Sequence, residues 1–267
     1  MRFRPLFAGV FLSSAAVLAL GVAACSSDGG GNGTRPEDAG ADTSIGPVGT
    51  NESKQKGRII DAIDKFGVAG ATVSIAGKTA LTKDDGTYEI VVPRNTPYTM
   101  SVTASEHYKL NEQEWIVKTE LFDRTDTSLL STSIANLLAS FLPPRDAAKG
   151  LLVVKVNPLP PCDSEQGSTL SIEPAGTSKV TYFAAGKPST SATSAAKGEA
   201  FSAAFSDVDV GVAIKVTVNS PTCEQVPFPI DYQDVTYTGV QKTEPGEVLS
   251  YIRVFIGPKK VGDAGTD

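Results

Sequence analysis

Few residues of this chain could do catalytic chemistry. His107 is the only histidine, so a Ser-His-Asp or Cys-His arrangement would have to use it. It lies in Ser105–Tyr108 (SEHY), which is predicted to be a loop, and no Gly-x-Ser-x-Gly elbow accompanies it. Zinc needs several His or Cys ligands at set spacings, and phosphate needs a glycine-rich loop; the sequence has neither pattern. We therefore expect no catalytic residue, no metal site, no cofactor and no enzymatic activity.

Two pairs of carboxylates lie close together in the sequence. Asp84 and Asp85 precede Gly86, a combination typical of a tight turn, because Asp bonds its own backbone and Gly accepts positive φ. Asp207 and Asp209 (in SDVDVG) could contribute to a calcium site, but the spaced third ligand and terminal Glu of an EF-hand are missing. We expect a turn at the first pair and a solvated loop at the second.

The N-terminal residues 1–24 have the pattern of a targeting signal. A short basic stretch precedes Leu6–Ala19, an apolar run too short to span a membrane. It leads to Val22–Cys25 (VAAC), where small residues before a cysteine resemble a bacterial lipobox. In that family a peptidase cleaves before the cysteine, whose sulfur carries a diacylglycerol and whose amine carries a further acyl chain such as palmitate.

The lipobox resemblance implies a lipoprotein anchored to a membrane through lipidated Cys25, since its acyl chains bury enough methylenes for stable attachment. The alternative is an ordinary secretory signal with a coincidental cysteine. Ser26 follows Cys25. In the enterobacterial sorting rule an Asp there favours the inner membrane, so Ser favours the outer membrane. The expected location is the cell envelope of a Gram-negative bacterium.

Two cysteines remain, Cys162 and Cys223. An even pair in an oxidising compartment predicts a disulfide, with two free buried thiols as the alternative. Closing a loop of about 60 residues would stabilise the fold by roughly 4 kcal/mol on the chain-entropy model.

Residues 25–56 and 259–267 carry too few apolar side chains to offset the entropy of ordering, so both are expected to be disordered. The first segment would act as a spacer with a mean reach on the order of 30 Å. The formal net charge is −6 and no basic stripe occurs, which excludes nucleic acid as an expected partner.

The β-strands that would position any site are predicted from the alternation of apolar and polar residues along the sequence. Residues 70–92 alternate apolar and polar side chains with the period of two that a half-buried strand requires. The turn at residues 84–86 divides this segment. We therefore expect it to form a hairpin of a small β-sandwich. The apolar positions are Ala71, Val73, Ile75, Tyr88, Ile90 and Val92.

Three segments in order, Gly57–Asp61, Val68–Val73 and Thr82–Ile90, resemble the carboxypeptidase regulatory-like domain. The resemblance covers about a quarter of the chain, residues 57–122, and departs from the family at Gly67–Val68, where an extra residue and Pro are usual. It implies a transthyretin-like β-sandwich and no chemistry of its own. Members of the family occur on metallopeptidases, as starch-binding-like modules and as repeats in surface proteins.

A helix is expected within the connector formed by residues 123–149. Residues 126–142 place Leu130, Ile134, Leu137 and Phe141 on one stripe, which Leu129, Leu138 and Leu142 widen, and Pro143–Pro144 stops the helix. We expect the stripe to be buried against the sandwiches. A partner-docking helix is the alternative.

Alternation returns in residues 150–258, which we interpret as a second β-sandwich. Gly167–Ile172 matches Gly70–Ile75 at four of six positions, and Lys215–Val218 corresponds to Thr99–Val102, so the second half is interpreted as a divergent copy of the first. The expected fold class is all-β: two small transthyretin-like or Ig-like β-sandwiches joined by one α-helix.

These expectations favour a non-catalytic cell-envelope lipoprotein whose sandwiches bind a partner or serve as spacers at the cell surface. The partner would be another envelope protein or a polysaccharide. A carbohydrate-binding module is the alternative, with Trp115, Tyr108 and Tyr182 as candidate ligand contacts, because sugars stack on exposed aromatic faces. A remoter alternative is an accessory domain of a peptidase.

Replacing Cys25 with Ala tests the lipid anchor. The variant should move from the membrane to the soluble fraction, because it has no sulfur to receive the diacylglycerol. Cell fractionation with immunodetection measures this. Ser26→Ala, which keeps the cysteine, should stay on the membrane, and membrane binding by Cys25→Ala as firm as wild type would contradict the anchor.

Overall fold

The computed structural model describes residues 48–142 and 144–259. The leader, Cys25, most of the expected spacer and residues 260–267 lie outside this range. Within it, no helix is both long and apolar enough to cross a membrane.

Nineteen strands and one short helix make up the described part of the chain, so the predicted all-β class is confirmed. The helix is α1 (Thr132–Ala139). A four-stranded sheet has the order β4–β1–β8, and β9 also pairs with β1. Its strands are β1 (Glu52–Asp61), β4 (Thr87–Pro93), β8 (Leu121–Asp123) and β9 (Thr127–Leu129).

A ten-stranded sheet has the order β13–β12–β14–β10–β19–β6–β5–β2–β3, and β16 also pairs with β19. Its strands are β2 (Thr72–Ile75), β3 (Lys78–Leu81), β5 (Met100–Thr103), β6 (Lys109–Glu112), β10 (Gly150–Pro158), β12 (Lys179–Ala184), β13 (Lys187–Ser189), β14 (Ala203–Val208), β16 (Cys223–Gln225) and β19 (Val248–Pro258). Two smaller sheets are formed by β11 (Thr169–Glu173) with β15 (Lys215–Asn219), and by β17 (Ile230–Tyr232), β18 (Val235–Tyr237) and β7 (Trp115–Val117).

In the first half, the alternation of residues along the strands determines which side chains enter the core, as predicted. The apolar positions of β2 and β4 are buried, and the polar positions between them are half-buried. The two sheets face each other across a core of Ile59, Val73, Ile75, Tyr88, Ile90, Val92, Met100, Val102 and Trp115.

The turn at residues 83–86 does not close a two-stranded hairpin, which corrects the prediction. β2 pairs with β3 through the tighter turn at Ala76–Gly77, whereas β4 crosses to the other sheet and pairs with β1. The Asp85 carboxylate accepts hydrogen bonds from the Thr87 amide and hydroxyl, as expected of a turn. Gly86 has a φ of 82°, and a Cβ there would collide with the Ile59 carbonyl, so glycine is needed for this crossing.

β1 begins at Glu52, inside the segment that we expected to be disordered. Two of its polar side chains bond to neighbouring segments: Gln55 donates to the Tyr98 hydroxyl at 2.6 Å, and Lys54 pairs with Glu89 of β4 at 2.7 Å. The strand gains a full ladder with β4, from Glu52↔Pro93 to Arg58↔Thr87. Backbone pairing and these side-chain bonds order a stretch whose composition alone predicts disorder.

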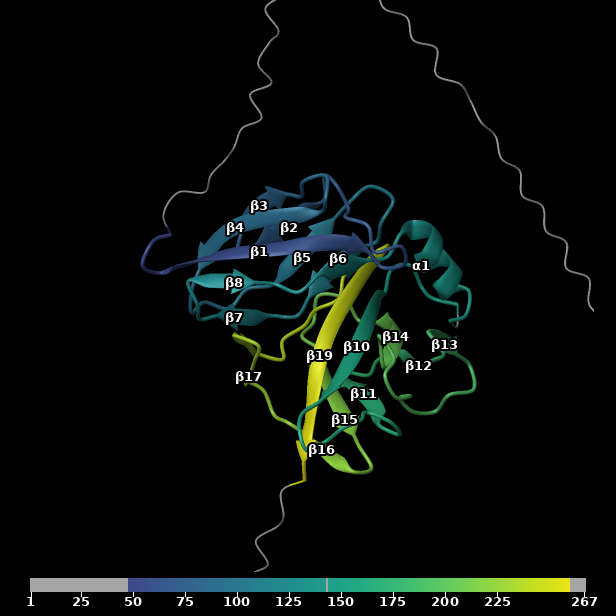
Figure 1. The fold of residues 1–267 in the computed structure, drawn as a ribbon. Helices are drawn as coiled ribbons and strands as arrows, with labels where there is room; N and C mark the ends of the chain where they lie inside the picture. The colour runs from purple at the N-terminus through teal and green to yellow at the C-terminus, as the bar shows by residue number, and fades with distance from the viewer. Residues whose placement is uncertain (1–47, 143, 260–267) are drawn as a thin grey trace, which may run out of the picture. The chain divides into compact units, whose positions relative to one another are not determined.

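One strand, β19, connects the two halves (Figure 1). It pairs in parallel with β10 over Leu151–Pro158 and in parallel with β6 over Lys109–Glu112. The β17–β18 hairpin also returns to the first half, where β18 pairs with β7. The halves therefore share a continuous sheet, and the described residues belong to one compact unit.

The second half has its own core under β11 and β15. These strands pair antiparallel, with Leu170↔Val218 and Ile172↔Val216 in register. In the first half, the matching strands are β2 and β5. They also pair antiparallel, with Val73↔Val102 and Ile75↔Met100 in register. The predicted Cys162–Cys223 disulfide is present, with a Cα–Cα distance of 6.4 Å, and it borders this core.

The helix is shorter than predicted, and it buries a different face. Residues 127–129 form β9 instead of a helical turn, because they complete a parallel pair with β1. Leu137 and Phe141 of the predicted stripe are 55% and 40% exposed, while Leu130 and Ile134 are half-buried. The expected burial of the whole stripe is therefore wrong.

Candidate functional site

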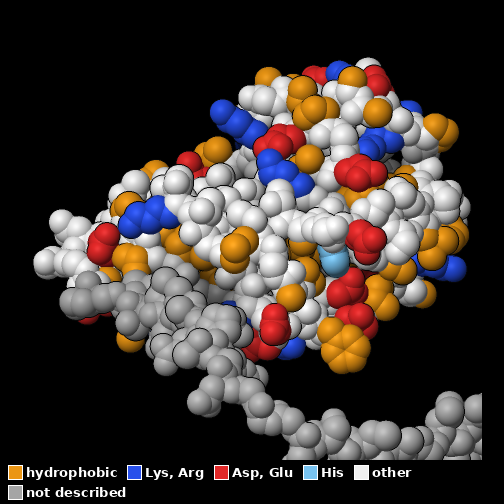
Figure 2. Space-filling view, turned by 90° about the horizontal axis from the view of Figure 1, so that it is seen from above, with side chains coloured by type: hydrophobic (Ala, Val, Ile, Leu, Met, Phe, Trp, Pro, Cys, Tyr) orange, Lys and Arg blue, Asp and Glu red, His pale blue; other side chains and the backbone are white. Residues whose placement is uncertain are grey.

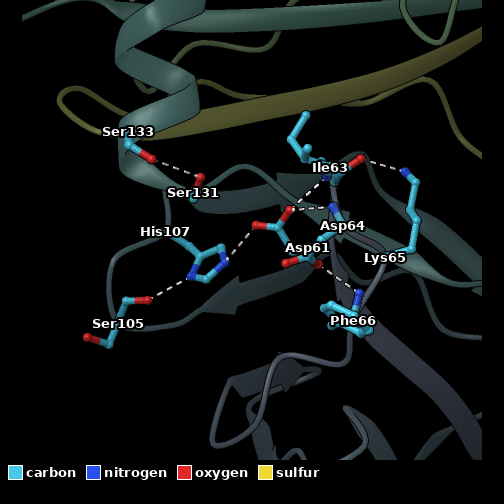
Figure 3. A network of polar contacts seen from close by, with 10 residues as sticks. Asp61, Ile63, Asp64, Lys65, Phe66, Ser105, His107, Ser131 and Ser133 are labelled. Atoms are coloured by element: carbon cyan, nitrogen blue, oxygen red, sulfur yellow. Dashed lines mark hydrogen bonds and ion pairs between the residues drawn. The ribbon is translucent and has the colours of Figure 1, made fainter. Parts of the chain in front are cut away.

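The single histidine belongs to a structural network at the end of β1 (Figure 3). The His107 Nδ1 lies 2.7 Å from the Ser105 carbonyl, which can only accept, so this nitrogen carries a proton. Nε2 lies 3.4 Å from the Asp61 carboxylate. Asp61 also accepts from the Ile63 and Asp64 amides. Both nitrogens of His107 face acceptors of the fold, so neither is directed at a nucleophile.

The second carboxylate pair is neutralised by lysines. Asp207 lies 3.1 Å from Lys179 and accepts from the Asp146 amide at 2.8 Å, and Asp209 lies 2.6 Å from Lys149. The hydrogen bond from the Asp146 amide is the main reason that the pKa of Asp207 is lowered. In residues 48–142 and 144–259, no three His, Cys, Asp or Glu side chains gather to hold a metal ion.

The three aromatic residues proposed as ligand contacts are buried. Trp115 packs edge-on to Tyr98 at 5.0 Å and is only 1% exposed. Tyr108 and Tyr182 are also buried, and the Tyr182 hydroxyl accepts from the Leu170 amide at 2.8 Å. Trp115 and Tyr182 pack in the two hydrophobic cores, and the Tyr108 hydroxyl donates to Asn136, so the three do not form an open platform for a sugar.

A cleft lies between the ten-stranded sheet on one side and α1 with residues 124–130 on the other. It consists of two adjoining cavities of 360 and 270 Å³ that share six lining residues. Their combined size and their largely apolar lining are typical of small-ligand sites. We call this feature the helix cleft and define it by the shared residues Tyr108, Leu130, Leu138, Phe183, Phe201 and Leu249.

One face of the connector forms the roof of the helix cleft. Ala135, Leu138, Ala139 and Leu142 line it at the spacing i, i+3, i+4, i+7, one face of a helix. Leu138 and Leu142 were part of the predicted apolar stripe; the small residues Ala135 and Ala139, which complete the inward face, were not. Figure 1 shows α1 beside the ends of β10 and β19, which supply lining residues from below.

One end of the larger cavity is polar. Arg124, between β8 and β9, pairs with Glu112 of β6, and both side chains are nearly buried. The Arg124 guanidinium also lies 4.9 Å from the centre of the Trp115 ring. Burial alone would lower the pKa of Arg124, but attraction to Glu112 outweighs it and the net direction is upward.

Three phenols, one buried and two half-buried, lie near this ion pair. Burial raises the pKa of Tyr251 to about 12, and burial likewise raises the pKa of Tyr88 and Tyr237. Desolvation disfavours the phenolate, so these hydroxyls keep their protons at neutral pH. Tyr251 lines the larger cavity, while Tyr237 lines another cavity of 210 Å³, which shares Arg124, Thr125 and Arg253 with the larger one.

The surface carries no single-sign charge patch on the face seen from above. Figure 2 shows Lys and Arg mixed with Asp and Glu there, with hydrophobic side chains between them and the histidine beside acidic groups. Such a face offers no basic track for a nucleic-acid backbone.

Sequence reasoning missed the polar end of the helix cleft. Glu112 and Arg253 come from β6 and β19, which pair in the shared sheet, and Arg124 comes from the segment between β8 and β9. A faint signal does exist in β19, where Arg253, the one charged residue of the strand, stands between Ile252 and Val254.

No protein-family model matches the chain, and a search of curated proteins finds no relative. The resemblance to the carboxypeptidase regulatory-like domain therefore stays an expectation from the sequence motifs. Among solved structures, a chain of a type II cohesin–X-dockerin complex from Acetivibrio cellulolyticus is 22% identical over 29% of this chain and 56% of its own, with a TM-score of 0.25.

Two further structures cover more of this chain at lower identity. The Bacillus anthracis TIE protein is 12% identical over 77% of this chain and 34% of its own, with a TM-score of 0.25. A streptococcal ancillary pilin is 10% identical over 78% and 63%, also with a TM-score of 0.25. The chain spans less than two thirds of each of these three proteins. Likenesses with such low TM-scores carry no argument about function.

Removing the carboxylate of the buried ion pair should destabilise the fold. Glu112→Gln leaves the Arg124 charge buried without its counterion, so the free energy of unfolding should fall by about 3–5 kcal/mol in urea denaturation. The matched control is Glu173→Gln, which breaks an exposed ion pair with Lys215 at 4.0 Å. It should leave the free energy of unfolding, measured in the same way, unchanged. Equal, small effects of the two changes would mean that water stabilises Arg124.

Proposed function

We propose that this protein is a non-catalytic, lipid-anchored binding module of the cell envelope, and that its ligand site is the helix cleft. The anchor rests on Cys25 and the leader, and the outer membrane is the proposed location. The observation that carries the proposal is the cleft itself: two adjoining cavities of 360 and 270 Å³, largely apolar with one polar end, that have six lining residues in common.

The shape of the cleft supports binding over a purely structural role. Protein cores are close-packed, and an apolar space of this volume forgoes dispersion contacts that a tight interior would make. An apolar ligand restores those contacts, so the loss is recovered on binding. A module that served only as a spacer would gain nothing from such a space.

The position of the cleft fits a site that opens by a small movement. Over the smaller cavity its roof is α1 with the residues that follow it, and Leu137 is on the exposed side of this helix. Residues 124–130 line the larger cavity, to which α1 contributes Leu138. The floor of the cleft is the ten-stranded sheet, including β10 and β19. Displacement of α1 would widen the smaller cavity without loss of the sheet.

The proposed site is tested with N-phenyl-1-naphthylamine, a neutral fluorescent probe, on the full-length Cys25→Ala chain, which carries no diacylglycerol on residue 25. The probe should bind and brighten as it leaves water. Leu138→Trp, which fills the helix cleft, should weaken binding at least tenfold. Leu137→Trp, on the exposed side of the same helix, should keep the wild-type dissociation constant within twofold.

Near-ultraviolet circular dichroism of both variants establishes that they are folded. Failure of the probe to bind the Cys25→Ala chain, or equal effects of the two tryptophans, would overturn the assignment of the helix cleft as the ligand site.

A further inference from the structure

Along β19, the side chains that form the floor of the larger cavity change from apolar to charged. Leu249, Tyr251 and Arg253 alternate along β19, so they project from the same face of the sheet, and all three line the cavity. Successive members lie about 7 Å apart along the strand. The cavity floor therefore runs from an aliphatic side chain through an aromatic one to a cation.

Arg253 differs from the other charged residues of this cavity. In the part of the chain that the structure describes, no carboxylate lies within 4 Å of its guanidinium. The other cavity charges are engaged: Glu112 pairs with Arg124, Asp126 with Arg58 at 3.7 Å, Lys65 donates to the Ala62 carbonyl, and Glu199 accepts from the Gly186 amide.

Arg253 keeps its charge without an ion pair: burial lowers its pKa, but the neighbouring Tyr251, Tyr237 and Glu112 together raise it by more. Its guanidinium lies 5.7 Å from the Tyr251 ring, and it lines both the larger cavity and the polar 210 Å³ cavity. Asp123 and Asp234 also line the polar cavity, but both are exposed to solvent, which screens their charge.

We propose that the helix cleft binds an amphiphile with an apolar body and one anionic head group, and that Arg253 contacts the head group. This inference rests on the proposed function and names its ligand class. A planar guanidinium offers paired N–H donors to a carboxylate, sulfonate or phosphate, and a partly desolvated site strengthens such bonds. The apolar body extends from Arg253 along Tyr251 and Leu249 beneath α1.

Two probes that share one ring system isolate the head group. The neutral probe is N-phenyl-1-naphthylamine, and the anionic one is 8-anilino-1-naphthalenesulfonate, which adds a sulfonate. Arg253→Gln in the Cys25→Ala chain should weaken binding of the sulfonate probe about tenfold, the loss of roughly one charge-assisted hydrogen bond. The neutral probe should change by less than twofold.

Two further variants control for charge and folding. Arg253→Lys keeps the cation and should retain sulfonate affinity within about threefold. Lys215→Gln removes an exposed lysine away from the cleft and should change neither dissociation constant. Equal weakening of both probes by Arg253→Gln, or no weakening of the sulfonate probe, overturns the proposal.

A displacement measurement in the Cys25→Ala chain needs no change at Arg253. Decanoate should displace the neutral probe at a concentration about tenfold lower than decanol does, because only decanoate offers a carboxylate. Equal potency of the two contradicts the role of Arg253. If the neutral probe binds while the head group has no effect, the helix cleft stands and only the anion inference falls; if neither probe binds, both fall.

Discussion

The pairing of β19 with strands on both sides is the interaction on which the rest of the structure depends. On one edge it is hydrogen-bonded to β10 and on the other to β6, so the ten-stranded sheet is continuous through it. Its two faces serve different cores: Ile252, Val254 and Ile256 pack in the second half, while Leu249 and Tyr251 pack with the first. Without this strand the two halves would share few backbone hydrogen bonds.

The helix cleft follows from the shared sheet. Its floor combines Leu110 from the first half with Val153 and Phe183 from the second, and α1 covers the junction. A connector of two independent sandwiches would leave this helix against one surface or in water. Here it lies over a seam between halves, where a short helix with alanines on its inner face leaves space. The ligand site that we propose is thus a consequence of how the halves join.

Local patterns predicted local structure well. Alternation located the buried positions of β2 and β4, and the cysteine count located the disulfide. Long-range pairing carries no such local signal. The strand partners of β4, the early start of β1 at Glu52 and the return of β18 to β7 depend on residues far away in sequence. The prediction of a buried stripe failed for a related reason: hydrophobicity alone selected Leu137 and Phe141, whereas the helix turns the side that carries Ala135 and Leu138 toward the cleft.

Differential scanning calorimetry of the Cys25→Ala chain, with its disulfide intact, tests the central claim most directly. If β19 makes both halves one body, unfolding should be a single transition whose van 't Hoff and calorimetric enthalpies agree, because neither half can melt and leave the shared sheet. Two separated transitions, or a van 't Hoff enthalpy near half the calorimetric value, would show that the halves unfold independently and would contradict the account.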